Sequence, residues 1–219
     1  METSIPAFNP MDPLSSNCKR CHVSSLDALS YLHSNSICHR DVKPKNILLS
    51  GPRDIQLCDF GSALQLNERN TSLGGLNSYI CSRYYRAPEL LLGSNAYGLP
   101  VDLWSAATVW GELITGSPLF WGESTGDQIL EITRVFGIPS LSEVEDMQLN
   151  EMEDSMIHVL KMTLQRLEPR SLHSILWPHL QDEGDFNFIQ RLLSYSPCRR
   201  PTAIETHEFL HQKSTVRVT

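Results

Sequence analysis

Two carboxylates, one lysine and one asparagine follow one another in an order that suits the transfer of a phosphoryl group. Asp41, Lys43 and Asn46 lie within H-R-D-V-K-P-K-N, residues 39–46, and Asp59 opens the string D-F-G. Phosphoryl transfer needs a nucleophile held in line, and positive charge on the phosphates and their metal. Any one of these residues could be an ordinary loop residue, but their order and spacing together indicate such a site.

Each of the four side chains can meet one of those chemical needs. Asp41 can accept the proton of a substrate hydroxyl and orient its oxygen. Lys43 places a point charge beside that aspartate, where the transferring phosphate passes. Asn46 and Asp59 offer a neutral and an anionic oxygen, which are ligands that Mg²⁺ accepts. We therefore predict Asp41, Lys43 and Asn46 as catalytic, Lys43, Asn46 and Asp59 as cofactor-binding, and Asn46 and Asp59 as ligands of the metal.

The order of the motifs resembles that of a protein kinase. H-R-D-V-K-P-K-N is followed by D-F-G at 59–61 and by A-P-E at 87–89, as in the catalytic half of that family. Lys43-Pro44 after the aspartate resembles Ser/Thr kinases rather than Tyr kinases. The strings C-D-F-G-S-A and S-Y-I-C-S-R-Y-Y-R-A-P-E, at 58–63 and 78–89, are similar to glycogen synthase kinase 3, within the group that includes cyclin-dependent and MAP kinases. The resemblance implies ATP and Mg²⁺ as cofactors and proteins as substrates.

The same resemblance assigns roles in the loop after D-F-G. It implies that Tyr79 is the activating tyrosine, and that Arg83 and Arg86 hold its phosphate. Arg40 joins this basic group, and in the family it also contributes to a pocket for a substrate that already carries a phosphate. Leu64 stands where the family has a lysine of that pocket, so one contact to such a substrate is missing. From the residues alone, Tyr79 could instead be a packed aromatic side chain.

Three further residues match positions that support the family's fold. Glu89 of A-P-E and Arg200 in P-C-R-R-P are similar to the family's buried ion pair. Asp102, which opens D-L-W-S, resembles the carboxylate that accepts backbone N–H bonds from the catalytic loop. The resemblance therefore implies structural roles for Glu89, Arg200 and Asp102.

The resemblance covers only one lobe of a kinase. No G-x-G-x-x-G, no V-A-I-K-type lysine and no glutamate-bearing helix to pair with that lysine is found before residue 39. We expect residues 1–22 to be a disordered or unrelated lead, residues 23–211 a truncated kinase C-lobe, and residues 212–219 a tail. The expected fold is mainly α within the α+β class, a helical C-terminal lobe with a small β-hairpin pair and without the N-terminal β-lobe.

Apolar periodicity and turn residues place the expected elements. A helix begins at Ser24 or Ser25 and ends before residues 34–36. Two short strands at 47–49 and 55–57 are separated by Gly51-Pro52. A buried helix covers 102–114, a second covers 127–136, and a third includes the apolar residues of 188–193. A capping box, T-A-I-E at 202–205, opens the last helix, and the acidic stretch 143–166 is expected to be helical.

The composition of the chain limits which classes of partner and which cellular compartment we expect for it. A net charge of −7 and a pI near 5.6 argue against a nucleic-acid or anionic-membrane partner. No apolar run approaches the roughly 20 residues that span a bilayer, and the first residues lack the pattern of a secretory signal. The six cysteines are scattered and fit free thiols in a reducing compartment. We expect a cytoplasmic or nuclear protein, or both.

Three functional hypotheses follow. The first is a protein serine/threonine kinase whose 219-residue chain is weak or inactive alone, because the lysine–glutamate pair is missing while the metal ligands remain. The second is a non-catalytic, pseudokinase-like C-lobe that serves as a protein-binding module. The third is a product without a stable role, because the uncovered cleft would expose apolar surface. By resemblance, helix 127–136 and the insert after it could dock a scaffold protein, and the alternative is a plain core helix with a surface loop.

Overall fold

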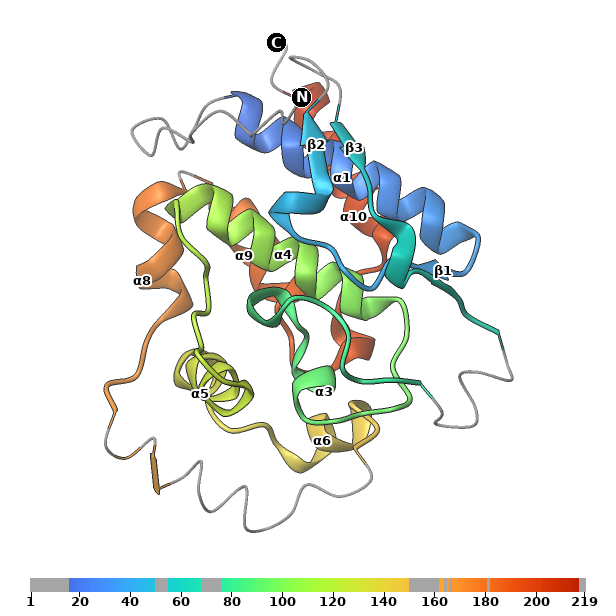
Figure 1. Ribbon diagram of the computed structural model, residues 1–219. Coiled ribbons are helices and arrows are strands. Elements are labelled where there is room, and N and C mark those ends of the chain that lie inside the picture. The colour runs from blue at the N-terminus through green and yellow to red at the C-terminus, as the bar shows by residue number, and fades with distance from the viewer. Residues whose placement is uncertain are drawn as a thin grey trace.

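The computed structural model describes residues 16–49, 55–67, 76–149, 162–163, 165, 167–180 and 182–216. Within these ranges the chain is mainly helical, and its strands form two sheets of two strands each (Figure 1). The predicted fold class, a helical kinase-like lobe with little β-structure, is confirmed. No described helix is long and apolar enough to cross a bilayer.

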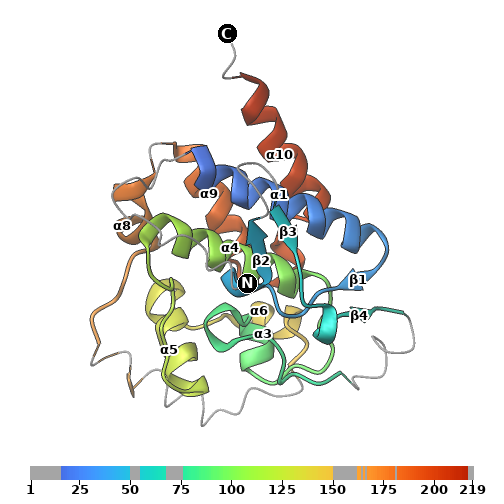
Figure 2. The same ribbon diagram turned by 45° about the horizontal axis from the view of Figure 1, so that its top comes forward.

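Helix α4 (Pro100–Thr115) forms the centre of the fold. Almost every side chain of its first three turns is buried, which accounts for the apolar residues around most of its circumference. Pro100 starts the helix, where a missing N–H costs nothing, and Gly116 ends it with φ +78°. Figures 1 and 2 show α4 between the pair of α1 (Ser16–Ser34) and α10 (Ala203–Val216) and the layer that contains α3 (Pro88–Leu91), α5 (Thr125–Phe136) and α6 (Leu141–Asp146).

Two helices complete this arrangement on the remaining sides of α4. Helix α8 (Leu172–Leu176) and helix α9 (Glu183–Leu192) both contact α4, and α8 also contacts α9. The apolar residues predicted near 188–193 lie in α9 and at its end, where Phe188, Ile189 and Leu192 are buried. Among the described residues, five short 3₁₀ helices link the main elements: η1 (Pro44–Asn46), η2 (Phe60–Ser62), η3 (Arg83–Tyr85), η4 (Trp177–His179) and η5 (Pro197–Arg199).

Both sheets are antiparallel and lie beside the catalytic loop. Strands β2 (Ile47–Leu49) and β3 (Ile55–Leu57) pair with Ile47 opposite Leu57, as the predicted strands 47–49 and 55–57 require. The second pair, β1 (Ile37–Cys38) with β4 (Leu64–Gln65), was not predicted. Each of its strands has two residues, too few to show an alternating pattern.

The first helix corrects one prediction. Helix α1 begins at Ser16, eight residues before the expected cap at Ser24, so residues 16–22 of the expected lead are helical. No glycine or proline interrupts the chain between Ser16 and Ser34, and the helix continues through the possible capping serines. Leu26, Leu29 and Leu32 are buried, and α1 packs against α10 and α4. Residues 1–15 and 217–219 lie outside the described ranges.

Capping boxes set the starts of three helices. Ser124 with Asp127 caps α5, and Thr202 with Glu205 caps α10 as predicted. Ser140 and Glu143 do the same for α6, which ends at Asp146. The stretch expected to be helical over 143–166 is thus interrupted after Asp146, and residues 162 and 163 are helical again. Residues 150–161 lie outside the described ranges.

A buried ion pair joins α3 to η5. Both Arg200 terminal nitrogens donate to the Glu89 carboxylate, at 2.6 and 2.7 Å, and both side chains are almost completely buried. The guanidinium also donates to three backbone carbonyls, those of Ser194, Pro100 and Tyr195. Because every Arg200 donor has a partner, the pair is fully satisfied, and loss of one member leaves a buried charge.

Glu89→Ala should therefore be strongly destabilising. The uncompensated Arg200 charge should lower the free energy of unfolding by about 3–5 kcal/mol, measured by urea denaturation with far-UV circular dichroism. Glu145→Ala, at an exposed position of α6, is the matched control and should change stability by less than about 0.5 kcal/mol. Equal midpoints for the two variants would contradict the proposed importance of the pair.

Candidate active site

The loop that carries Asp41 is anchored to the first turn of α4. The backbone N–H groups of His39 and Arg40 donate to the two oxygens of the buried Asp102 carboxylate, each at 2.8 Å. His33 Nε2 lies 2.9 Å from Asp102 Oδ2. Arg40 has φ +66°, a left-handed conformation that a non-glycine residue adopts only when its surroundings hold it. Asp102 supplies that restraint, since it binds the N–H of this residue and of the one before.

The structure brings three predicted residues together around the Asp41 carboxylate. Lys43 Nζ donates to Oδ2 at 2.5 Å, and the Asn46 amide donates to Oδ2 at 3.2 Å and to the Asp41 carbonyl at 2.8 Å. On the other side, the Ser82 N–H and hydroxyl donate to Oδ1 at 3.1 and 3.2 Å. The carboxylate is thus oriented from both sides, as a base that must meet a substrate hydroxyl requires.

The same contacts set the protonation of Asp41. Burial raises the pKa of this carboxyl, but the hydrogen bond and positive charge of Lys43, together with the bonds from Ser82, outweigh burial and hold the pKa below its ordinary value. Asp41 is therefore ionised at neutral pH, as a proton acceptor must be.

Asp59 lies beside Asn46 because the β2–β3 pair places it there. The Cys58 N–H donates to the Asn46 carbonyl at 2.9 Å, so the next residue emerges at the end of the same ladder. Asp59 is exposed, has φ +65° and accepts a hydrogen bond from the Gly61 N–H at 3.4 Å. This backbone bond brings the D-F-G aspartate close to the catalytic-loop asparagine, although the two are 13 positions apart in the sequence.

These two residues fit a magnesium ion that arrives with a nucleotide. Asn46 uses its amide nitrogen to bind Asp41, so the ligand it can offer is the amide oxygen, and Asp59 offers an exposed carboxylate. No cluster of three or more His, Cys, Asp or Glu side chains that could hold a metal occurs in the described residues. Mg²⁺ usually takes one or two protein oxygens and fills its remaining positions with water and substrate phosphates, so the donor set suits it.

An aromatic contact supports the D-F-G turn. The His39 ring is buried, packs edge-on against Phe60 at 5.1 Å, and its Nε2 lies 3.1 Å from the Cys58 carbonyl. The Phe60 side chain remains 50% exposed. His39 thus joins the catalytic loop to the segment that carries Asp59.

Arg83 and Arg86 of the loop after D-F-G, and Arg40 of the catalytic loop, bind backbone carbonyls and a hydroxyl. Arg40 donates to the Ser62 carbonyl and the Tyr97 hydroxyl, while Arg83 donates to the carbonyls of residues 122 and 123. Arg86 is buried, donates to the carbonyls of residues 80 and 81, and lies over the Tyr79 ring at 4.7 Å. Tyr79 is 76% exposed, so its ring does not lie in the core. Arg86 thus lies beside Tyr79, whereas Arg83 and Arg40 bind other groups. Leu64, in β4, is half-buried and pairs with Cys38.

Sequence reasoning missed several functional neighbours. Ser82 binds the Asp41 carboxylate from 41 residues away, and His33 binds Asp102 from 69 residues away. Both residues lie in segments that the sequence had already marked: Ser82 is within the string that carried the resemblance, and His33 is at the end of a predicted helix. Neither residue type at these positions indicates its partner, since the contact depends on the fold.

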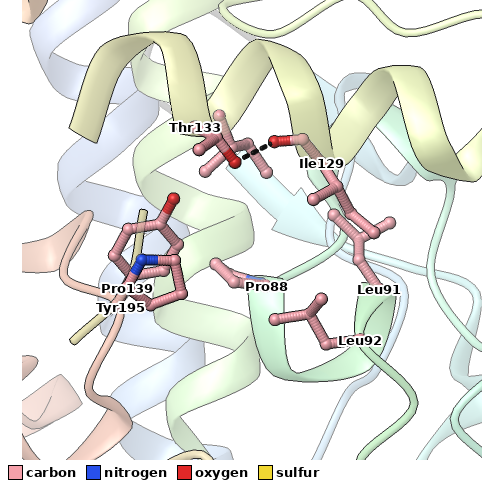
Figure 3. Close-up of a pocket in the computed structure, with 8 residues that line it drawn as sticks. Pro88, Leu91, Leu92, Ile129, Thr133, Pro139 and Tyr195 are labelled. Carbon is pink, nitrogen blue, oxygen red and sulfur yellow. Dashed lines mark hydrogen bonds between the residues drawn. The ribbon is translucent and has the colours of Figure 1, made fainter. Parts of the chain in front are cut away.

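A small apolar pocket lies where α5 packs on α3 (Figure 3). Its volume of about 10 Å³ leaves room for about one water molecule. Ile129 and Ile132 of α5 thus face the core, and a scaffold would have to use other side chains of helix 127–136. The pocket is lined by Pro88, Leu91, Leu92, Ile129, Ile132, Thr133, Pro139 and Tyr195.

Comparison with known proteins agrees with this geometry. The family model described as the protein kinase domain matches residues 14–213. The chain therefore belongs to the protein kinase family.

Within that family the chain is similar to glycogen synthase kinases. It is 42% identical over 179 residues to glycogen synthase kinase 1 of Pyricularia oryzae, covering 81% of this chain and 42% of that protein. It is 40% identical to protein kinase gsk3 of Schizosaccharomyces pombe, over 85% of this chain and 46% of that protein. It is 38% identical to serine/threonine-protein kinase RIM11/MSD1 of Saccharomyces cerevisiae, over 81% and 45% respectively. The match spans less than half the length of each of these relatives.

The pKa of Asp41 gives a test of the Lys43 contact. At pH values above 3.8, the ordinary pKa of an aspartate carboxyl, ionised Asp41 contributes to the stability of the folded chain. This contribution is lost as the pH falls through the lower pKa that Asp41 has in the folded state. Lys43→Met should raise the folded-state pKa, because burial remains while the cation is gone. A ¹³C NMR titration of the Asp41 carboxyl measures it.

Lys45→Met, two residues further on at an exposed position, is the matched control and should leave the Asp41 titration unchanged. If Lys43→Met also leaves it unchanged, the bonds from Ser82 and not the lysine determine the pKa.

Proposed function

We propose that this chain carries the phosphoryl-transfer site of a protein serine/threonine kinase, which moves the terminal phosphate of ATP to a Ser or Thr hydroxyl. The observation that supports it is the Asp41 carboxylate, which Lys43, Asn46 and Ser82 orient while Asp59 lies beside Asn46. The similarity to relatives named as kinases points the same way.

The arrangement suggests a role for each group. The substrate oxygen forms the new bond to the γ-phosphorus as the bond to the β–γ bridging oxygen breaks, and the hydroxyl proton passes to Asp41. Lys43 offsets the negative charge on the transferring group. Asn46 and Asp59 are the residues that would hold Mg²⁺, which supplies positive charge to the phosphates of ATP.

The 219 residues alone should transfer phosphate slowly. Their described part supplies the base and the two metal ligands, but the sequence contains no glycine-rich phosphate loop and no V-A-I-K-type lysine. Kinases need both the lysine–glutamate pair and the metal-binding aspartate in place. Phe60, half-exposed beside His39, lies on a face that another polypeptide segment could cover.

Binding of Mg·ATP can be measured by thermal unfolding. At ten times its Kd, Mg·ATP should add about 1.4 kcal/mol to the free energy of unfolding, which is a shift of a few degrees in Tm. Asp59→Asn should abolish the shift, whereas Asp41→Asn, which keeps both metal ligands, should retain most of it.

The outcomes separate the hypotheses. Cooperative unfolding that ignores Mg·ATP in every variant would contradict nucleotide binding and favour a non-catalytic binding module. An absent cooperative transition would contradict a lobe that folds alone.

Phosphoryl transfer should depend on Asp41. With γ-labelled ATP and a serine-containing protein such as casein, we expect a low rate that Asp41→Asn reduces by at least about 100-fold. Lys45→Met is the control and should retain the rate. Fast transfer by the unchanged chain would refute the expectation of low activity, and transfer that persists in Asp41→Asn would refute the assignment of Asp41.

Two finer roles are part of the proposal. A phosphate on the exposed Tyr79 would draw on Arg86, already over its ring, and on Arg83, which would have to leave the carbonyls it now binds. A scaffold protein would dock on the outer face of α5, together with the segment that follows α6. Residues 150–161 of that segment lie outside the described ranges.

A further inference from the structure

Trp121 is an exposed aromatic residue in a fold that buries most of its other large ones. Its side chain is 60% exposed, whereas Phe120 beside it and the tryptophans of α4, Trp104 and Trp110, are buried. The Trp121 ring lies 5.8 Å from the Tyr84 ring at an angle of 51°. Large exposed aromatic surface at a fixed position is more typical of a binding site than of the general surface.

The turn that carries Trp121 is held rigidly. The buried Gln128 side chain accepts from the Gly122 N–H at 2.8 Å and donates to the carbonyls of Phe120 and Tyr84 at 3.2 and 3.4 Å. A Cβ on Gly122 would stand 2.2 Å from the Gln128 backbone nitrogen, so only glycine permits this approach. The Arg83 guanidinium donates to the carbonyls on the other side of the turn. Trp121 is therefore fixed relative to η3.

The Trp121 and Tyr84 rings lie close to Asp41 along the chain that contacts it. Ser82, which donates twice to the Asp41 carboxylate, lies two residues before Tyr84. Two residues of extended chain span at most about 7 Å. A peptide whose hydroxyl reaches Asp41 thus passes within a few residues of the Trp121 and Tyr84 rings.

The charged groups near the two rings are two carboxylates and one arginine. Glu123, two residues after Trp121, is exposed, and the half-buried Glu112 accepts a hydrogen bond from the hydroxyl of Tyr85, whose ring lies 6.5 Å from that of Tyr84. The nearby cation, Arg83, is already bound to two carbonyls. Aromatic faces with carboxylates beside them favour a positively charged side chain, and arginine stacks best.

We propose that Trp121, Tyr84 and Glu123 form a subsite for a basic side chain of the protein substrate, arginine above all, a few residues from the phosphorylated hydroxyl. This inference rests on the proposed function, since it places a substrate peptide at Asp41. Trp121 and Tyr84 supply the stacking surface and Glu123 the charge, so the subsite sets specificity and takes no part in the chemical step.

The test is peptide binding by the full 219-residue chain. Fluorescein-labelled peptides of twelve residues carry one serine in an alanine–glycine background, with a single arginine, leucine or alanine placed at each position in turn. Fluorescence anisotropy gives each Kd without ATP. We expect arginine at one or two positions near the serine to tighten binding about fivefold over alanine, and Trp121→Ala to remove that preference.

Three variants make the result specific. Trp121→Phe retains an aromatic face and should keep most of the preference for arginine. Glu123→Gln should weaken that preference and make the remaining binding less dependent on salt concentration. Trp177→Ala, which removes another exposed tryptophan, one that stacks on His173, should have no effect. Thermal unfolding of each variant shows whether it is folded.

Two results would overturn the proposal. The first is equal binding of the arginine and alanine peptides by the unchanged chain, and the second is an arginine preference that survives Trp121→Ala. A leucine preference lost in Trp121→Ala would overturn the assignment of a basic side chain. If the peptides bind as expected but no Asp41-dependent transfer occurs with ATP, the subsite stands and the proposed kinase function fails.

Discussion

The Asp102 carboxylate is the interaction on which the site depends. It lies at the start of a buried helix and accepts from two consecutive N–H groups of the catalytic loop. A carboxylate can do this because its two oxygens point in different directions, so each N–H has its own acceptor. The left-handed Arg40, the position of Asp41 and the approach of Ser82 all follow from where Asp102 holds the loop.

Three acidic residues show how one functional group serves different purposes. Glu89 is buried against Arg200, and Asp102 is buried against backbone donors, so both hold structure together. Asp41 is only partly buried, and its partners leave it ionised yet reachable. Burial and the kind of donor distinguish a structural carboxylate from one that can take part in proton transfer.

The sequence allowed prediction of features that are encoded locally. The strands at 47–49 and 55–57 follow from apolar runs around Gly-Pro, and the capping box at Thr202 follows from the spacing of two side chains. Motif order identified the residues around Asp41, because spacing along one loop limits where they can lie. Helix α1 begins earlier than predicted. A serine that could serve as an N-cap starts a helix only where tertiary contacts favour a start at that position.

Contacts between distant segments could not be predicted in this way. Ser82 meets Asp41, and Arg83 meets the turn after Phe120, only after α4 and α5 have packed. The β1–β4 pair depends likewise on where the D-F-G segment returns to the catalytic loop. Such contacts are decided by the relative placement of whole elements, which local propensity does not specify.

The separation of these partners along the chain also has a consequence for synthesis on the ribosome. The catalytic loop is made first, but its anchor Asp102 follows 63 residues after His39, and Arg200 follows 111 residues after Glu89. At a translation rate of about 5–20 residues per second, those intervals last from about 3 to over 20 seconds. During that time the strained loop has no carboxylate to hold it and a charged glutamate has no counterion. The nascent lobe therefore cannot reach its final packing until translation has passed Arg200.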